Sequence, residues 1–414
     1  MAQPPGIHAR RAALQMLDAV LRRGETLEQA EQTALKPVRS VPDKALARAI
    51  ANEALRWLTD LDALIDSATS QRLPDDAKAR SVLRLMLAQW LRLGTPPHAV
   101  VATALPLLSG GPRRLAHGVF STLAKRGATL PAAPSLPPEV AARWGDPAPS
   151  IATGLADPPP LDLTLRDGLR DPALTGPVAV KLGGESYAPG HARLSRGVAV
   201  EKIEGYREGQ WWVQDLAASL PARLLGEGAG RHALDLCAAP GGKTMQLAAL
   251  GWNVTALDLS KRRLDLLRNN LKRTGLKASL VRADALAWEP KHRFDAILLD
   301  APCTATGTCR RHPDVLHRIG ARQIAEMAEL QAALLKRASG WLKPGGVLVY
   351  AVCSLEREEG EDQAALVPLE PLPIGPQELP VGISPTPEGW LRTHPGMLPE
   401  RGGLDGFFVA RWRA

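Results

Sequence analysis

Two cysteines follow short apolar runs in the C-terminal half of this 414-residue chain. Cys303 lies in LLDAPC, and Cys353 lies in VYAVCS. A lone cysteine is most often a buried, unreactive side chain, and we expect this of Cys309. Two thiols at the ends of neighbouring strands could instead share one cleft, where a thiolate can add to an electrophilic carbon. The pair therefore predicts thiol chemistry rather than a disulfide framework.

The segment DLCAAPGGKT (235–244) combines an apolar strand, a small-residue turn and the start of a helix. A phosphate-binding loop also ends in Gly-Lys-Thr, but Cys237 stands where that loop needs its first glycine. Pro240 has no N–H to offer a phosphate. The turn therefore predicts a ligand that approaches the backbone closely. It disfavours an ATP-dependent enzyme, and an ordinary strand–helix turn is the plainer alternative.

Three acidic residues end successive apolar runs: Asp258, Asp284 and Asp300. In a doubly wound sheet, an acidic residue after the second strand accepts hydrogen bonds from a ribose diol. Asp284 could then meet an adenine amino group. Each aspartate alone could be a helix N-cap, but three in order favour a nucleoside site without phosphates. S-adenosylmethionine is a ligand of this kind.

A thiol next to such a site suits methyl transfer to cytosine. Carbon 5 of cytosine is a poor nucleophile, and addition of a thiolate to carbon 6 makes it enamine-like. A carboxylate that shares a proton near ring N3 would stabilise the adduct, and we expect Asp300 to take this role. A target base inside RNA has to be unstacked before it can react.

Charge and composition favour a soluble protein with an anionic partner. The net charge is +8, and residues 1–130 hold 18 Lys and Arg against 11 Asp and Glu. A basic module indicates nucleic acid, although a solvated arginine-rich surface is the plainer alternative. No apolar run is long enough to span a membrane, and no signal peptide is evident, so we expect a cytoplasmic location. The cysteines form no C-x-x-C pair, so we expect no metal site.

The periodicity of apolar residues divides the chain into four predicted parts. Residues 1–130 predict an all-α bundle, and residues 131–150, rich in Pro and Ala, predict a linker around one short helix. Residues 151–212 predict a small α+β unit. Residues 213–414 predict a parallel, doubly wound α/β domain.

Strands are expected wherever short apolar runs end at turn residues. In the small unit, the expected strands are 161–165, 178–182, 198–203 and 211–213. In the doubly wound domain, they are 232–237, 253–259, 278–284, 294–300 and 346–352.

The motifs DLCAAPGGKT, LLDAPCTATG, RRHPD and VCS resemble those of the RNA 5-methylcytosine methyltransferases, the NOL1/NOP2/Sun family. The resemblance covers about 200 residues, from Val213 to the end. GGLDGFFVARW (402–412) is similar to the closing strand of that family. The N-terminal helices are similar to a NusB-type RNA-binding bundle.

The resemblance implies a Rossmann-like methyltransferase domain in which Cys353 is the nucleophile and Cys303 assists release of the methylated RNA. It implies that S-adenosylmethionine is held by Cys237, Ala238, Ala239, Pro240, Gly241, Gly242, Lys243, Asp258, Asp284 and Asp300. It implies that the RNA side is lined by Arg310, Arg311 and His312. The family usually has Thr before the nucleophile, where this chain has Val352. The missing hydroxyl leaves the thiol in place.

The NusB-like part favours 16S rRNA over tRNA as the substrate, and we expect a monomer that does not bind membranes. A non-catalytic RNA-binding factor for ribosome assembly belongs to a different class of function. The presence of Asp300, Cys303 and Cys353 disfavours it, because a degenerate enzyme could lose all three.

Overall fold

The computed structural model describes residues 6–197 and 199–414, which form two compact units. The helical unit comprises the chain up to residue 157 together with residues 309–319. The α/β unit comprises residues 158–308 and 320–414. These boundaries differ from the four predicted parts, because residues 131–150 join the helical unit and the small predicted unit shares one body with the doubly wound sheet.

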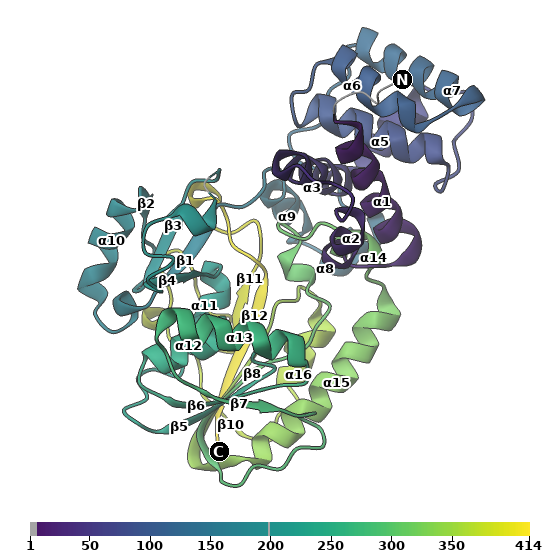
Figure 1. The fold of residues 1–414 in the computed structure, drawn as a ribbon. Helices are drawn as coiled ribbons and strands as arrows, with labels where there is room; N and C mark the ends of the chain where they lie inside the picture. Colours follow the sequence, from purple (N-terminus) through teal and green to yellow (C-terminus); the bar gives the residue numbers. More distant parts are fainter. Residues whose placement is uncertain (1–5, 198) are drawn as a thin grey trace. The chain divides into compact units, whose positions relative to one another are not determined.

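The helical unit is built from amphipathic helices around one apolar core (Figure 1). Its helices are α1 (Ile7–Arg23), α2 (Leu27–Ala34), α3 (Val41–Arg56), α4 (Leu58–Ser67), α5 (Lys78–Leu91), α6 (Pro97–Ala104), α7 (Gly110–Lys125), α8 (Pro138–Trp144), α9 (Ala148–Gly154) and α14 (Val315–Arg318). Leu17, Ile50, Leu55, Met86 and Phe120 are almost fully buried in the core. The predicted all-α bundle is confirmed.

Residues 131–150 belong to the helical unit, so the predicted separate linker is wrong, while the short helix expected within it is present as α8 (Pro138–Trp144). Val140 and Trp144 of α8 are buried. Ser135 donates from its N–H and its hydroxyl to Asp60, at 2.8 and 2.7 Å. Proline is well tolerated in the first turn of a helix, and Pro138 begins α8. A proline in the Pro-rich stretch that predicted a linker therefore begins a helix instead.

Residues 309–319 pack within the helical unit, although we expected them in the catalytic domain. Arg56 of α3 donates from Nη2 to the carbonyl of Arg310 at 2.8 Å. His317 of α14 donates from Nε2 to the carbonyl of Leu55 at 2.7 Å. Burial of the imidazole lowers the pKa of His317.

The α/β unit contains a small antiparallel sheet with strand order β2-β3-β1-β4. Its strands are β1 (Leu161–Leu165), β2 (Gly184–Glu185), β3 (His191–Leu194) and β4 (Trp211–Val213). Two expected strands are wrong: residues 178–182 fall mostly in helix α10 (Thr175–Lys181), and residues 199–203 contain a 3₁₀ turn, while residue 198 lies outside the described residues. Short apolar runs do not distinguish strand from helix, and Pro177 suits the first turn of α10.

The large sheet has, within the described residues, eight strands in the order β10-β12-β9-β8-β5-β6-β7, with β11 paired to β12. The strands are β5 (His232–Leu236), β6 (Asn253–Asp258), β7 (Ser279–Arg282), β8 (Phe294–Asp300), β9 (Leu342–Val352), β10 (Glu370–Pro371), β11 (Leu391–Thr393) and β12 (Phe407–Arg413). Strands β5 to β9 pair in parallel, and β12 is antiparallel to β9. The predicted doubly wound α/β fold is confirmed.

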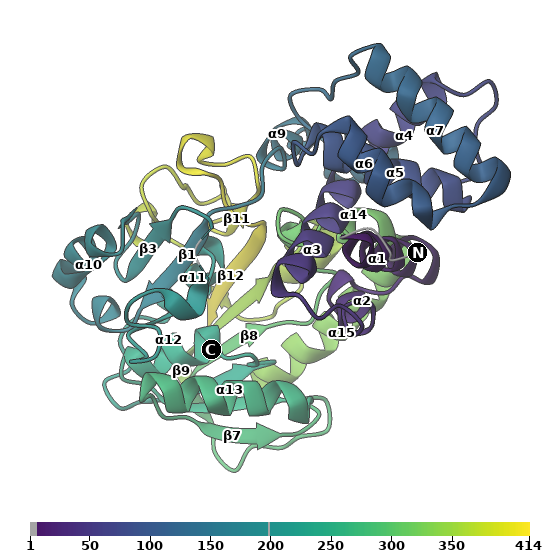
Figure 2. The same cartoon turned by 45° about the horizontal axis from the view of Figure 1, so that its top comes forward.

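Helices cover both faces of the large sheet (Figures 1 and 2). One face is covered by α11 (Leu216–Arg223), α12 (Gly242–Ala249) and α13 (Lys261–Thr274). The other is covered by α15 (Ala321–Gly340) and α16 (Glu361–Ala364). Adjacent residues of β8 face opposite cores, since Leu298 packs on the α11 side and Leu299 on the α15 side. Among the described residues, no helix has the length and apolar content that a membrane crossing requires.

We predict that Arg80→Ala destabilises the helical unit. The Arg80 side chain is fully buried and donates to Asp66 at 2.6 and 3.0 Å and to Asp62 at 3.1 Å. Removing one partner of a buried ion pair leaves the remaining charges uncompensated, so we expect a loss of about 3 kcal/mol in the free energy of unfolding. Urea denaturation followed by circular dichroism measures this loss.

Arg72→Ala is the matched control for this change. Arg72 also lies beside Asp66, but its side chain is 67% exposed. Exposed pairs contribute little, so we expect a change below about 0.5 kcal/mol. Equal losses in the two variants would contradict the assignment of Arg80 as the buried centre of this network.

Candidate active site

The turn between β5 and α12 is held in a shape that its small residues permit. Cys237 and Gly241 have positive φ angles of 61° and 105°. A Cβ atom on Gly241 would come within 2.0 Å of Leu267 Cδ1, so only glycine fits there. The Ala239 N–H donates to Asp258 Oδ2 at 3.1 Å, which ties the turn to the end of β6.

One side of this turn borders a cleft of about 270 Å³, which we call the Asp258 cleft. Asp258 and Asp284 line it, and each accepts one backbone N–H on Oδ1 at 2.9 Å, from Ser260 and Leu286 respectively. Each carboxylate keeps further lone pairs for a ligand. Leu259 is 67% exposed on the cleft wall.

The Asp258 cleft offers acceptors and apolar walls whose chemistry suits an adenosine group. Its ribose hydroxyls and adenine amino group are donors that suit the Asp258 and Asp284 carboxylates. Leu259 and Leu286 supply apolar walls for the ring. Asp258 also holds the turn, and the N-cap of α13 is Ser260 rather than Asp258.

The other side of the turn borders the Lys243 cleft, of about 400 Å³. Lys243 Nζ lies 2.7 Å from Asp300 Oδ2 and 5.3 Å from the centre of the Phe407 ring. Burial lowers the pKa of Lys243, but the Asp300 charge and hydrogen bond outweigh it and leave that pKa above its ordinary value. The ammonium of Lys243 is therefore the proton-bearing partner of this ion pair.

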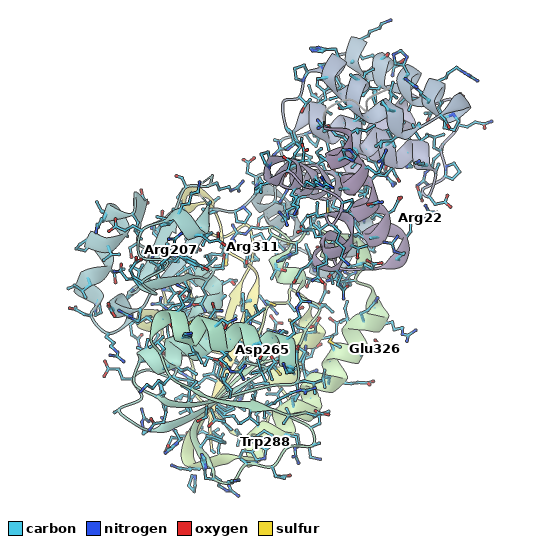
Figure 3. All side chains as sticks on the ribbon, viewed as in Figure 1. Arg22, Arg207, Asp265, Trp288, Arg311 and Glu326 are labelled. Atoms are coloured by element: carbon cyan, nitrogen blue, oxygen red, sulfur yellow. The ribbon has the colours of Figure 1, made fainter. Side chains whose placement is uncertain are left out.

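The small sheet and α13 contribute to the Lys243 cleft residues that the sequence did not reveal. They are Tyr206, Trp212, Gln214, Asn270 and Arg273. Arg273 stacks on the Tyr206 ring at 4.4 Å. No motif marks these positions, because they meet only when the small sheet packs beside α13. The solvent-facing side of α13 carries Asp265 (Figure 3).

Cys303 and Cys353 lie together, as their positions after β8 and β9 predict. Their sulfur atoms are 3.4 Å apart. The hydrogen bond with Cys353, and then burial, raise the pKa of Cys303 well above its ordinary value. Burial raises the pKa of Cys237 to about 12, so that thiol is no nucleophile. Cys309 is fully buried, which confirms its expected structural character.

The expected RNA-side residues lie in the helical unit. Arg310 is 1% exposed, so its side chain is too buried to line an RNA surface, and this prediction is wrong. Arg310 begins the RRHPD motif, which lies in the segment 309–319 of the helical unit. Arg311, labelled in Figure 3, is half-buried according to its accessible surface, His312 is exposed, and their RNA contacts stay predictions. Among the described residues, no group of three or more His, Cys, Asp or Glu side chains could hold a metal ion.

Together the α/β unit holds a thiol pair, an ammonium–carboxylate pair and a cleft that fits adenosine at one edge of one sheet. A nucleophilic thiol with a protonated thiol beside it can add to an electron-poor ring. The ammonium–carboxylate pair can hold a proton near the ring as charge develops. Such a site suits group transfer through a covalent adduct.

The chain has two matches to protein families. Residues 222–413 match the family described as 16S rRNA methyltransferase RsmB/F, and residues 7–109 match the NusB family. The ribosomal RNA small subunit methyltransferase B of Salmonella paratyphi C (strain RKS4594) is 35% identical over 397 residues, covering 86% of this chain and 88% of that protein. The protein of the same name from Salmonella choleraesuis (strain SC-B67) gives the same values.

Solved structures share the fold. The crystal structure of PH0851 has a TM-score of 0.72 at 22% identity and covers 99% of both chains. A methyltransferase homolog protein from Pyrococcus horikoshii has a TM-score of 0.55 at 27% identity, over 71% of this chain and 97% of that one. NSun6 from Pyrococcus horikoshii with SFG has a TM-score of 0.56 at 22% identity, over 67% and 98%.

We predict that Asp235 makes stability fall as pH rises. Asp235 is fully buried on β5; Thr244 donates to its Oδ2 at 2.5 Å, and its Oδ1 has no partner. Burial raises its pKa to about 7, so the folded chain holds this proton more tightly than the unfolded chain. The stabilisation is complete below about pH 4 and is lost as pH rises through 7. Asp235→Asn should make the free energy of unfolding less dependent on pH. At pH 8 the free energy of unfolding of this variant should exceed that of the wild type by up to about 4 kcal/mol.

Urea denaturation at several pH values from 4 to 8 measures this difference. Asp265→Asn is the control, because Asp265 is exposed and its pKa is lowered by hydrogen bonds from Lys261 and Arg268, so it titrates below this window. If the free energy of unfolding changes with pH equally in Asp235→Asn and the wild type, another group causes the pH dependence.

Proposed function

Because the chain belongs to the family of ribosomal RNA small subunit methyltransferases B, we propose that it methylates carbon 5 of a cytosine in 16S rRNA through a transient covalent bond to Cys353. The observation that carries the proposal is the thiol pair, with 3.4 Å between sulfur atoms, beside the adenosine-fitting cleft. We expect the protein to act as a monomer in the cytoplasm.

S-adenosylmethionine is the methyl donor, and it supplies a methyl group on a positively charged sulfur. Asp258 and Asp284 would hold its adenosine in the Asp258 cleft. The turn from Cys237 to Lys243 would hold the rest, with backbone approach possible because its residues are small.

Cys353 would act as the nucleophile. Its thiolate forms a bond to carbon 6 of cytosine, and the electrons of the double bond between carbons 5 and 6 move into the ring towards N3. Carbon 5 thereby becomes nucleophilic. Once carbon 5 is methylated, loss of its proton to a base and departure of the Cys353 thiolate restore the aromatic ring.

Lys243 and Asp300 would stabilise the adduct, and Cys303 would assist release. The ion pair of Lys243 and Asp300 can supply a proton to N3 as negative charge develops there. We expected Asp300 to share a proton near ring N3. The ion pair extends this role to Lys243, because the ammonium carries the proton. The raised pKa of Cys303 keeps that sulfur protonated beside the reacting thiolate.

The helical unit would bind the RNA. Residues 7–109 match the NusB family, and Arg113 and Arg114 of α7 are exposed cations that could meet phosphates. The match of this unit to the NusB family favours rRNA over tRNA as the substrate. The described residues of the active site do not distinguish the two RNAs.

Methyl transfer from labelled S-adenosylmethionine tests the proposal. Unmodified 16S rRNA and total tRNA are offered separately, and the product is mapped by mass spectrometry. We expect label at carbon 5 of a cytosine in 16S rRNA. Label only in tRNA would overturn the substrate, and cofactor binding without label in either RNA or in partly assembled small subunits would favour a non-catalytic assembly factor.

We predict that Cys353→Ala abolishes this methylation, because no other thiol replaces the one that attacks carbon 6. RNA affinity in a filter-binding assay should stay within about twofold of the wild type, since loss of one side-chain atom removes little contact area. Cys309→Ala is the control that removes a thiol outside the site. Full activity of Cys353→Ala would overturn the covalent mechanism.

We predict that Cys303→Ala methylates its target and then releases it slowly. A covalent protein–RNA species should accumulate and appear on a denaturing gel as a slow band that is sensitive to RNase. The double variant Cys303→Ala, Cys353→Ala should lack the band, because the bond is to Cys353. A band of equal strength in the double variant would assign the bond to another residue.

A further inference from the structure

A buried glutamate, Glu359, lies behind the thiol pair and has no role in the mechanism above. It ends the 3₁₀ turn Arg357–Glu359, between β9 and α16, and its side chain is 0% exposed. An ionisable side chain is rarely buried without a partner. Its carboxylate accepts four hydrogen bonds, all from uncharged donors of Thr304, Ser354 and Gln331.

The glutamate carboxylate joins the residues that directly follow the two cysteines. On the side of Cys303, Thr304 donates from its N–H to Oε2 at 2.9 Å and from its hydroxyl to Oε1. On the side of Cys353, Ser354 donates from Oγ to Oε1 at 3.1 Å. One carboxylate therefore bonds to both strand ends, and each bond is one residue from a thiol.

Helix α15 completes this arrangement. Gln331 donates from Nε2 to Glu359 Oε2 at 3.0 Å and to the carbonyl of Pro302, which precedes Cys303, at 2.8 Å. Tyr350 of β9 donates from its hydroxyl to the Glu359 carbonyl at 2.6 Å. Gln331 Oε1 is buried without a hydrogen-bond partner, and the other bonds of this buried network favour one arrangement of its side chains.

We propose that Glu359 is a positioning residue that holds the two thiols within reach of each other and keeps the proton on Cys303. The proposal rests on the proposed function, which gives the two thiols their chemical role. The hydrogen bonds of Glu359 are independent of the substrate.

The electrostatics support the second part of this role. The hydrogen bond with Cys353, burial, the Cys353 charge and the Glu359 charge all raise the pKa of Cys303. Burial raises the pKa of Glu359, while its bonds from Thr304, Gln331 and Ser354 favour the ionised carboxylate. Burial outweighs these bonds and leaves the pKa of Glu359 raised; once Glu359 is ionised, its negative charge opposes a second negative charge on Cys303.

Two substitutions separate position from charge. Glu359→Gln keeps the size and removes the charge, and its amide NH₂ can donate to the Thr304 and Ser354 hydroxyls, which accept as well as donate. Glu359→Leu removes both the bonds and the charge. Glu358→Gln is the matched control, because Glu358 is the exposed neighbour in the same turn.

The first experiment needs no RNA. Cys303 alkylation by iodoacetamide is followed by peptide mass spectrometry at pH 8 in a Cys353→Ala background, so that one thiol does not block the other. Because only the thiolate reacts, we expect Glu359→Gln to increase the Cys303 rate about tenfold, which is the effect of lowering a thiol pKa by one. Glu358→Gln should leave the rate unchanged. An unchanged rate in Glu359→Gln overturns the charge role.

The second experiment measures turnover on 16S rRNA at saturating RNA. We expect Glu359→Leu to lower kcat at least about tenfold with little change in KM, because the thiols are misplaced and the RNA contacts are not. Glu359→Gln should recover most of that loss. In a Cys303→Ala background, Glu359→Leu should cost much less, because one of the two thiols that it aligns is already absent.

The outcomes separate this proposal from the proposed function. If Glu359→Leu fails to fold by circular dichroism, the Glu359→Gln alkylation rate decides. If the wild type methylates no RNA, the proposed function fails and alkylation still tests Glu359. Equal kcat in the wild type and a folded Glu359→Leu overturns the positioning role.

Discussion

The pairing register of β8 and β9 is the constraint on which the site depends. In this parallel ladder Asp300 lies opposite Ala351, and the Ala301 N–H donates to the Ala351 carbonyl at 2.9 Å. Cys303 follows Ala301 by two residues and Cys353 follows Ala351 by two residues, so both thiols leave the sheet at the same edge. A slip of one residue would turn every side chain of one strand to the opposite face, which would separate the sulfur atoms and break both apolar cores. Packing on both faces of the sheet therefore fixes the strand register that brings the two thiols together.

Burial then decides where protons reside. Lys243 keeps its proton because Asp300 is 2.7 Å away, and Cys303 keeps its proton because Cys353 and a nearby carboxylate oppose its ionisation. Asp235, one strand away, has no cation bonded to it, and burial raises its pKa to about 7. A low effective dielectric strengthens each of these effects. Carboxyl groups at this edge of the sheet therefore differ from one another in their affinity for protons, and so do the thiols.

The helical unit is joined to the α/β unit in a way that a linear division of the chain hides. The chain leaves the α/β unit after Thr308, contributes α14 to the helical unit, and returns at Gly320. The segment that follows the Cys303 motif is therefore held by Arg56 and by the carbonyl of Leu55. Removing residues 1–130 would take away those partners along with the basic surface. The two units are consequently interleaved in sequence and not simply consecutive.

The sequence by itself determined the doubly wound fold, the all-α bundle and the strand ends that carry Cys303, Cys353, Asp258 and Asp284, because parallel strands buried on both faces are apolar runs that end at polar residues. It also determined the glycine turn, since glycine readily adopts the positive φ of 105° found at Gly241. Only the tertiary structure decided the partner of Lys243, the buried place of Arg310, the helical use of residues 131–150 and the bonds of Glu359 to both strand ends. Each of these depends on contacts between residues that are distant in sequence, and local spacing contains no record of them. Short apolar runs such as 178–182 fit a strand or a helix equally well, so packing alone chose between them.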